Sequence, residues 1–362
     1  MRALKILQAG DLHLDSPFGG LGPEKARLRR QESRDLADRL AEAARKEGAD
    51  LLLLTGDLFD GGRVYPETLE RLTAALGSID CPVCISPGNH DPYGPDSPYA
   101  QGIWPRNVHI FKSEAPEALS LPELGCTVWG GAFTSPRRTD CPLLGVKGEG
   151  LAVGCFHGDV CSGDSVYGTI TREQIRASGL RYLALGHIHE ATCLRWEGGT
   201  CWAYSGCTEG RGFDELGDKG ALLVELTEEG VTARALPLCR RRYLDLQADT
   251  TVTDPRAALE RALSEARPED ICRVTFVGET ASPIGLGALE LAFQGSFFGL
   301  ELRDNTRPSR DIWDKLGEDS LRGLFLQGMK ERYDAAADDH ERELVVKAVR
   351  FGLGALDGRD ME

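Results

Sequence analysis

Five short motifs in the first half of the chain contain side chains that bind divalent metal ions. They read Asp11-Leu12-His13-Leu14-Asp15, Gly56-Asp57-Leu58-Phe59-Asp60, Gly88-Asn89-His90-Asp91, Phe156-His157-Gly158 and Gly186-His187-Ile188-His189. Five of the seven histidines lie in these motifs. Carboxylate, imidazole and amide groups together form sites for ions such as manganese, iron, cobalt or zinc.

Each motif alone is a weak indication. A single Gly-Asp pair is usually a turn, and a single histidine after an apolar stretch is usually an ordinary core residue. Here every motif follows an apolar run that is typical of a buried strand. Open α/β sheets bind ligands at the carboxyl ends of their strands, so we expect the motifs to meet in one crevice.

The motifs supply seven candidate metal ligands, which are enough for two ions with positions left open for water and phosphate. Residues two apart at the end of a strand share a face, so Asp11 and His13 could bind one ion, and His187 and His189 repeat that spacing. Asp57 could bridge both ions through its two oxygens. The ligands are Asp11, His13, Asp57, Asn89, His157, His187 and His189.

Two further residues have a predicted catalytic role. His90 is next to Asn89 and should point elsewhere, toward the phosphoryl group or the leaving oxygen. Asp60 could hold the imidazole of His90 in the productive tautomer. For Asp60 and Asp91 the alternative is hydrogen bonding within a turn.

The elements around the motifs predict a layered α/β domain. Strands at residues 4–9, 50–55 and 81–86 alternate with helices at residues 24–47 and 66–76, which is the β-α-β-α-β order of such domains. In the first helix, Leu28, Leu36, Leu40 and Ala44 are expected to face inward. Shorter strands follow after residue 104 and indicate a sandwich of sheets with the motifs along one rim.

The chain is long enough for two domains and a tail. We predict a catalytic domain at residues 1–238, a small α/β cap at 239–307 and a helical tail at 308–362. The tail helices, near 320–335 and 340–355, each carry an apolar stripe: Leu321, Leu324 and Phe325, then Leu344, Val345, Ala348 and Phe351. The tail either folds back on the cap or docks on a partner.

Composition limits the function. The chain has 42 Lys and Arg against 57 Asp and Glu, a net charge of −15, which is unlike a DNA-binding protein that acts alone. We expect a partner or a local patch to supply DNA affinity. Cys81 and Cys84 are interpreted as strand cysteines in a reducing cytoplasm. We expect no signal peptide and no membrane span.

The five motifs resemble those of calcineurin-like metallophosphoesterases, and within them the SbcD-type nuclease subunits. The segment at residues 206–215 also resembles the segment that follows the last motif in that branch, and the tail resembles bacterial YhaO-type DNA repair exonucleases. The resemblance implies a four-layer β-sandwich flanked by helices, a DNA-facing cap, DNA as substrate and an SbcC-like coiled-coil ATPase as partner. Relatives commonly pair through the catalytic domain, so a homodimer is a further expectation.

The resemblance also implies two manganese ions and assigns their ligands. One ion would be held by Asp11, His13, Asp57 and His189, and the other by Asp57, Asn89, His157 and His187. His90 would be the catalytic histidine. The archaeal and eukaryotic nuclease relatives have histidine where this chain has Asp60. Arg211 either contacts a phosphate or is a surface loop residue.

We therefore predict a cytoplasmic DNA nuclease that hydrolyses phosphodiesters through a metal-bridged hydroxide. We expect an exonuclease, and endonuclease activity stays open. The alternatives are a phosphodiesterase for cyclic nucleotides or other small molecules, and an architectural subunit of an ATPase complex.

Overall fold

The computed structural model describes residues 3–61, 63–280, 283–308, 312–313 and 316–358. The chain forms two compact units, Met1–Arg242 and Tyr243–Glu362. The further division of the second unit into a cap and a tail stays a prediction, and residues 309–311, at the start of the predicted tail, lie outside the described residues.

The first sheet of the first unit has six strands, in the order β14-β13-β1-β2-β3-β4. Four of them are parallel: β1 (Leu4–Ala9), β2 (Leu51–Leu54), β3 (Val83–Ile85) and β4 (Val108–Ile110). Strand β13 (Gly220–Leu226) pairs antiparallel with β1, and β14 (Val231–Pro237) pairs antiparallel with β13 at the edge. The four residues of β2 are all leucine and all buried, as expected for a strand covered on both faces.

The second sheet also has six strands, in the order β11-β12-β10-β7-β6-β5. Its parallel strands are β12 (Thr200–Tyr204), β10 (Tyr182–Gly186), β7 (Ala152–His157) and β6 (Cys126–Gly130). The edges are the antiparallel strands β11 (Arg195–Glu197) and β5 (Glu117–Leu121). The shorter elements of this unit are α4 (Pro98–Gln101), the 3-10 helix η1 (Pro122–Leu124), β8 (Asp159–Val160) and β9 (Thr169–Ile170).

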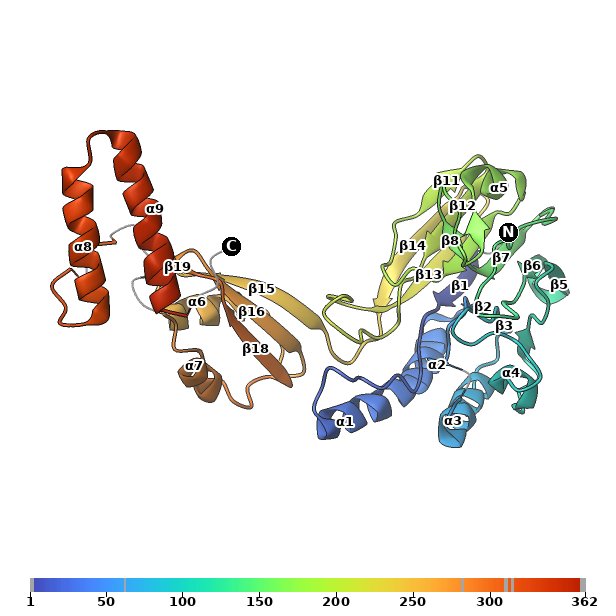
Figure 1. Ribbon diagram of the computed structural model, residues 1–362. Helices are drawn as coiled ribbons and strands as arrows, with labels where there is room; N and C mark the ends of the chain where they lie inside the picture. The colour runs from blue at the N-terminus through green and yellow to red at the C-terminus, as the bar shows by residue number, and fades with distance from the viewer. Residues whose placement is uncertain (1–2, 62, 281–282, 309–311, 314–315, 359–362) are drawn as a thin grey trace. The chain divides into compact units, whose positions relative to one another are not determined.

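Three apolar clusters separate four layers, which confirms the predicted sandwich flanked by helices (Figure 1). One cluster joins α2 (Leu36–Glu47) and α3 (Pro66–Gly77) to the first sheet. The second fills the space between the sheets. The third joins α5 (Arg172–Ala177) and nearby loops to the outer face of the second sheet.

A buried glutamine ties the two sheets together. The side-chain amide of Gln8, in β1, donates hydrogen bonds of 3.1 Å to the backbone oxygens of Leu185 and Ala203 in the second sheet. The Tyr182 hydroxyl donates to the other side-chain atom, Gln8 Oε1. A buried polar group needs such partners, so this contact fixes how the strand ends of the two sheets face each other.

The predicted helix at residues 24–47 is two helices, α1 (Pro23–Arg34) and α2, which meet at Asp35. The prediction that Leu28 faces inward is wrong, because Leu28 is 40% exposed. The buried face of α1 instead carries Arg29 and Glu32, which form ion pairs. The break at Asp35 lets α1 present charged groups and α2 present Leu36, Leu40 and Ala44 to the core.

The second unit contains a three-stranded parallel sheet, β15-β16-β18, with one face covered by helices. The strands are β15 (Tyr243–Asp249), β16 (Ile271–Val277) and β18 (Gly299–Asp304), and the helices are α6 (Pro255–Ala262) and α7 (Leu286–Ala292). A two-stranded sheet, β17 (Glu279–Thr280) with β19 (Arg307–Pro308), follows. The helical hairpin of α8 (Leu321–Ala335) and α9 (Asp339–Leu356) ends the described chain.

The α8–α9 hairpin buries one apolar face and exposes another. Its small core contains Leu326, Val349 and Leu353, with Phe325 and Val345 half-buried against it. The exposed group, which we name the hairpin surface, has side chains that are 50% to 70% exposed: Leu321, Leu324, Leu344 and Phe351.

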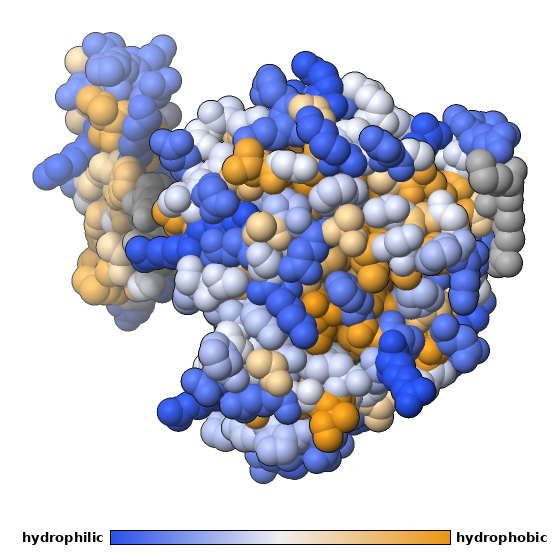
Figure 2. All heavy atoms as spheres, turned by 90° about the vertical axis from the view of Figure 1, so that its right-hand side faces the viewer, coloured by the Kyte–Doolittle hydropathy of each residue, from blue (hydrophilic) through white to orange (hydrophobic). Residues whose placement is uncertain are grey.

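Apolar residues also reach the surface elsewhere, among hydrophilic ones, on the face of the molecule that Figure 2 shows. Among the described residues, no helix is long and apolar enough to span a membrane.

Candidate metal centre

The seven predicted ligands converge at one rim of the first unit. Each follows the carboxyl end of a parallel strand, and both sheets contribute. From the first sheet, β1 leads to Asp11 and His13, β2 to Asp57, and β3 to Asn89. From the second, β7 ends at His157, and β10 leads to His187 and His189.

The backbone at this rim has an uncommon conformation. Asp11, His13, Asp57 and His187 have positive φ angles of 50°, 44°, 50° and 106°. Residues other than glycine rarely adopt this left-handed region, and such backbone strain is common at functional sites. Two backbone hydrogen bonds join the loop after β1 to the loop after β2. Asp11 N donates to Gly56 O, 2.9 Å, and His13 N donates to Asp57 O, 3.0 Å.

One group of ligands, which we name the first position, contains Asp11, His13 and His189. Their ligand atoms lie within 4.8 Å of one another. The Nε2 atoms of His13 and His189 are 3.2 Å apart, and His189 Nε2 is 3.7 Å from Asp11 Oδ1. Nitrogen and oxygen atoms that face each other at these distances leave room for one cation between them.

A second group, the second position, contains Asn89, His157 and His187. Asn89 Oδ1 lies 2.9 Å from His157 Nε2 and 3.2 Å from His187 Nδ1. The spacing argument placed His187 with His189 on one ion, and this is wrong. The left-handed backbone at His187 turns its ring toward Asn89, whereas His189 turns toward His13.

Asp57 lies between the two positions. Its Oδ2 is 3.9 Å from His13 Nε2 and 3.5 Å from His157 Nε2. Its Oδ1 accepts a 2.9 Å hydrogen bond from the backbone N–H of His90. This placement suits a carboxylate shared by two ions.

Electrostatics show that the donor set fits divalent cations. Burial, and then the nearby Asp57, raise the pKa of Asp11 well above its usual range. Burial lowers the pKa of His13 and His157, and lowers that of His187 to about 4. Neutral imidazoles and two crowded, buried carboxylates form a set that a cation would stabilise.

Asp60 contacts two of the histidines. Its Oδ1 is 3.1 Å from His13 Nδ1 and 3.6 Å from His90 Nδ1. It therefore lies closer to a metal ligand than to the residue that it was predicted to orient. Burial would raise the pKa of Asp60, but the hydrogen bond from His13 and the nearby Ser16 and Arg211 together outweigh it, and the pKa is lowered.

Arg211 and Glu215 complete this side of the site. Arg211 Nη1 lies 3.4 Å from Asp60 Oδ1, and its Nη2 lies 2.8 Å from Glu215 Oε1. Glu215 Oε1 is also 2.7 Å from His189 Nδ1. Arg211 thus pairs with two carboxylates, and its predicted contact with phosphate stays a prediction. Sequence reasoning assigned Glu215 no role, because a lone glutamate in a loop carries no spacing signal.

Asp91 joins two of the ligand loops. Its Oδ2 accepts hydrogen bonds from the backbone N–H groups of Leu58, 2.7 Å, and Phe59, 3.0 Å, and from the Tyr99 hydroxyl, 2.5 Å. Its Oδ1 accepts one from the Gly88 N–H, 2.9 Å. The bond from Gly88 is the turn hydrogen bond weighed as the alternative for Asp91, and the bonds from Leu58 and Phe59 hold the Asp57 and Asn89 loops together.

His90 is the predicted site residue that solvent reaches most easily. Its side chain is 47% exposed, whereas that of His13 is fully buried. Its ring lies edge-on to the ring of His13, with centroids 4.8 Å apart. The imidazole can therefore meet a bound molecule at the rim.

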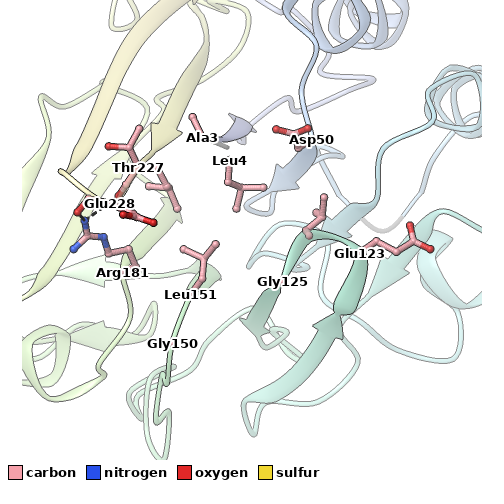
Figure 3. A pocket seen from close by; sticks show the side chains of 12 residues that line it. Ala3, Leu4, Asp50, Glu123, Gly125, Gly150, Leu151, Arg181, Thr227 and Glu228 are labelled. Atoms are coloured by element: carbon pink, nitrogen blue, oxygen red, sulfur yellow. Dashed lines mark hydrogen bonds between the residues drawn. The ribbon is translucent and has the colours of Figure 1, made fainter. Parts of the chain in front are cut away.

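A separate cavity of about 620 Å³ opens in the first unit (Figure 3). It is lined by Leu4, Leu151 and Leu226 and by the charged residues Asp50 and Arg181. Leu4 and Leu151 lie at or just before the amino ends of their strands. The cavity is therefore at the end of the sandwich away from the metal ligands.

Comparison with known proteins assigns the class. The model of the calcineurin-like phosphoesterase family matches residues 4–191, which contain all five motifs, and the chain belongs to this family. It is also similar to the "Uncharacterized metallophosphoesterase YhaO" of Bacillus subtilis (strain 168), with 33% identity over 251 residues. That alignment covers 63% of this chain and 59% of the relative's length.

Proposed function

We propose that this metallophosphoesterase is a metal-dependent DNA nuclease, mainly an exonuclease, that acts in the cytoplasm in DNA repair. The observation that carries the hydrolytic part is the convergence of seven metal ligands beside one exposed histidine. The DNA part rests on the resemblance of the motifs and of residues 206–215 to SbcD-type nucleases. The relative's name supports the coarser class of metallophosphoesterase.

The ligands divide into two sets around Asp57. Asp11, His13 and His189 would hold one ion, and Asn89, His157 and His187 the other, with manganese as the proposed metal. Two bound divalent ions supply positive charge that lowers the pKa of a water molecule and stabilises the attacking and leaving oxygens of a phosphodiester.

His90 is proposed to protonate the leaving oxygen. Its imidazole is exposed at the rim, and its backbone N–H is fixed by Asp57. Asp60 Oδ1 lies 3.6 Å from His90 Nδ1, and we propose that its charge favours a proton on that nitrogen and leaves Nε2 to face the substrate. Because Asp60 also contacts His13, it links the proton donor to the ligand set.

DNA binding requires positive charge that neither unit has in excess. Residues 1–242 contain 27 Lys and Arg against 33 Asp and Glu, and residues 243–362 contain 15 against 24. Phosphate contacts dominate DNA affinity, so we assign most of it to a partner. The proposed partner is an SbcC-like coiled-coil ATPase, which would bind the apolar hairpin surface as a helix-in-groove contact.

The acidic balance favours one rival function, hydrolysis of a small phosphodiester such as a cyclic nucleotide. Such a substrate needs no extended basic surface.

A substrate comparison separates the two functions. The purified full-length chain, loaded with Mn²⁺, is assayed on single-stranded DNA, on duplex ends, on a cyclic nucleotide and on a chromogenic phosphodiester. The nuclease assignment predicts that nucleotides are released from DNA and that release stops in EDTA. Hydrolysis of the small substrates with intact DNA would establish the rival.

A further inference from the structure

The two histidines of the first position each have a carboxylate behind them. His13 directs Nε2 toward the position, and its Nδ1 lies 3.1 Å from Asp60 Oδ1. His189 also directs Nε2 toward the position, and its Nδ1 lies 2.7 Å from Glu215 Oε1. In both rings the outer N–H can donate a hydrogen bond to a carboxylate, which leaves a free lone pair on the inner nitrogen.

The second position is built differently. The outer nitrogen of His157, Nδ1, lies 2.9 Å from the backbone oxygen of Thr55, which carries no formal charge. The oxygen ligand at this position is the neutral amide of Asn89, where the first position has the carboxylate of Asp11. Asp57 lies between the two positions, at similar distances from a nitrogen ligand of each, so its charge does not strongly favour cation binding at either one.

Both differences favour tighter cation binding at the first position than at the second. A carboxylate behind a metal-binding histidine fixes the tautomer and raises the basicity of the ring, and losing such a group typically weakens metal binding about 10- to 100-fold. The first position has two such carboxylates and one charged oxygen ligand. Arg211, which pairs with both carboxylates, offsets part of their charge and holds them in place.

Glu215 is fixed more firmly than a loop residue usually is. It is 3% exposed, and its Oε2 accepts a 2.7 Å hydrogen bond from the backbone N–H of Arg211. The segment before it is tied to the site by Cys207 N to His189 O, 3.1 Å, and by the Thr208 hydroxyl to Gly10 O, 2.9 Å. The carboxylate is therefore held against His189 by the fold around it.

We propose that the two positions bind divalent cations with unequal affinity, the first position filling before the second, and that Glu215 is the positioning residue chiefly responsible. The inference rests on the proposed two-ion site. Under limiting metal the protein would carry one ion, and the second ion would then control when the site is complete.

The test is a Mn²⁺ titration of the metal-free, full-length protein by calorimetry, with bound metal checked by elemental analysis. The wild type should bind two ions in two steps that differ at least about 10-fold in affinity. Glu215→Gln should weaken the tighter step about 10- to 100-fold and change the weaker step little. Asn89→Ala should remove the weaker step and keep the tighter one.

Glu190→Gln is the matched control, because Glu190 is the exposed neighbour of His189 and should leave both steps unchanged. Two equal steps in the wild type, or a Glu215→Gln variant that weakens only the looser step, would overturn the inference. Thermal unfolding of the metal-free variants shows that each is folded. Two-step binding without any hydrolysis would refute the proposed function and leave this inference intact.

Discussion

At the residue scale, Asp57 is the group that both ion positions share. Its Oδ2 lies within 3.9 Å of one nitrogen ligand from each position, and it is almost completely buried. Asp57→Asn keeps the shape and the hydrogen bond from His90 but removes the shared charge. We expect both bound ions to be weakened and turnover to fall at least about 100-fold.

Elemental analysis and turnover measured on the same samples check this prediction. Asp96→Asn, an exposed residue, serves as the control and should match the wild type. If Asp57→Asn lost one ion only and kept partial activity, the bridging role would be wrong.

His187 gives a prediction for pH. Burial lowers its folded-state pKa to about 4 from an ordinary 6.5, so between these values the unfolded chain binds more protons. The contribution of His187 to stability is therefore complete above pH 6.5 and is lost as the pH falls toward 4. In EDTA, the free energy of unfolding of the wild type should fall over this range more steeply than that of His187→Asn.

The comparison is made by urea unfolding at several pH values, and only the difference between the two proteins is interpreted. The raised pKa of Asp11 acts in the opposite sense, but it is present in both proteins. A difference that stays constant between pH 6.5 and 4 would contradict the prediction.

Spacing alone named the candidate ligands but not their grouping, which only the resemblance to metallophosphoesterases supplied. Ordered motifs at strand ends predict which side chains meet, because strand direction sets where each strand ends. They do not predict the left-handed backbone at His187, which sends it away from His189. Glu215 was also missed, since its contact with His189 depends on how the loop after β12 folds back.

At the element scale, α1 is held by charges rather than by apolar contacts. The carboxylate of Glu32 is buried and pairs with two arginines. Its Oε2 lies 3.1 Å from Arg29 Nη1, and its Oε1 lies 2.5 Å from Arg241 Nη2. Glu209, the other carboxylate of this network, pairs with Arg29 and Arg39 at 2.9 Å. The network connects α1 to the segment that carries Arg211 and Glu215.

We expect Glu32→Ala to lower the free energy of unfolding by about 3–5 kcal/mol, because it removes a buried carboxylate that pairs with two buried arginines, Arg29 and Arg241. Urea unfolding measures the change. The control is Glu67→Ala, which breaks the 3.2 Å pair with Arg34 at a side chain that is 64% exposed and should cost less than about 1 kcal/mol. A Glu32→Ala variant as stable as the control would show that the network does not hold α1.

Strands with buried apolar residues were predictable, and two edge strands without such a pattern were not. Strand β1 coincides with the run predicted at residues 4–9 because its residues are nearly all buried. Strand β14 was missed because four of its central residues, Thr232 to Ala235, are exposed and show no apolar pattern. Strand β5 at the edge of the other sheet was missed for the same reason.

At the scale of the whole molecule, net charge and the hairpin surface point to a partner. The double variant Leu324→Asp, Phe351→Asp changes two exposed side chains outside the hairpin core. We expect it to fold normally, to hydrolyse short substrates like the wild type, and to lose co-purification with a co-expressed SbcC-like ATPase.

Leu291→Asp, an exposed leucine on α7, is the control and should retain the partner. Normal co-purification of the double variant would remove the hairpin surface as the docking site.

The most direct test of the account is the His90→Ala variant, measured for both metal content and hydrolysis. His90 is exposed beside the ligands and is not needed to hold either ion in this account. The variant should keep the metal content of the wild type and lose about 10²- to 10⁴-fold in turnover. His340→Ala, an exposed histidine in the second unit, should retain both. A His90→Ala variant that loses its metal ions, or that hydrolyses substrate at a near-normal rate, would contradict the account.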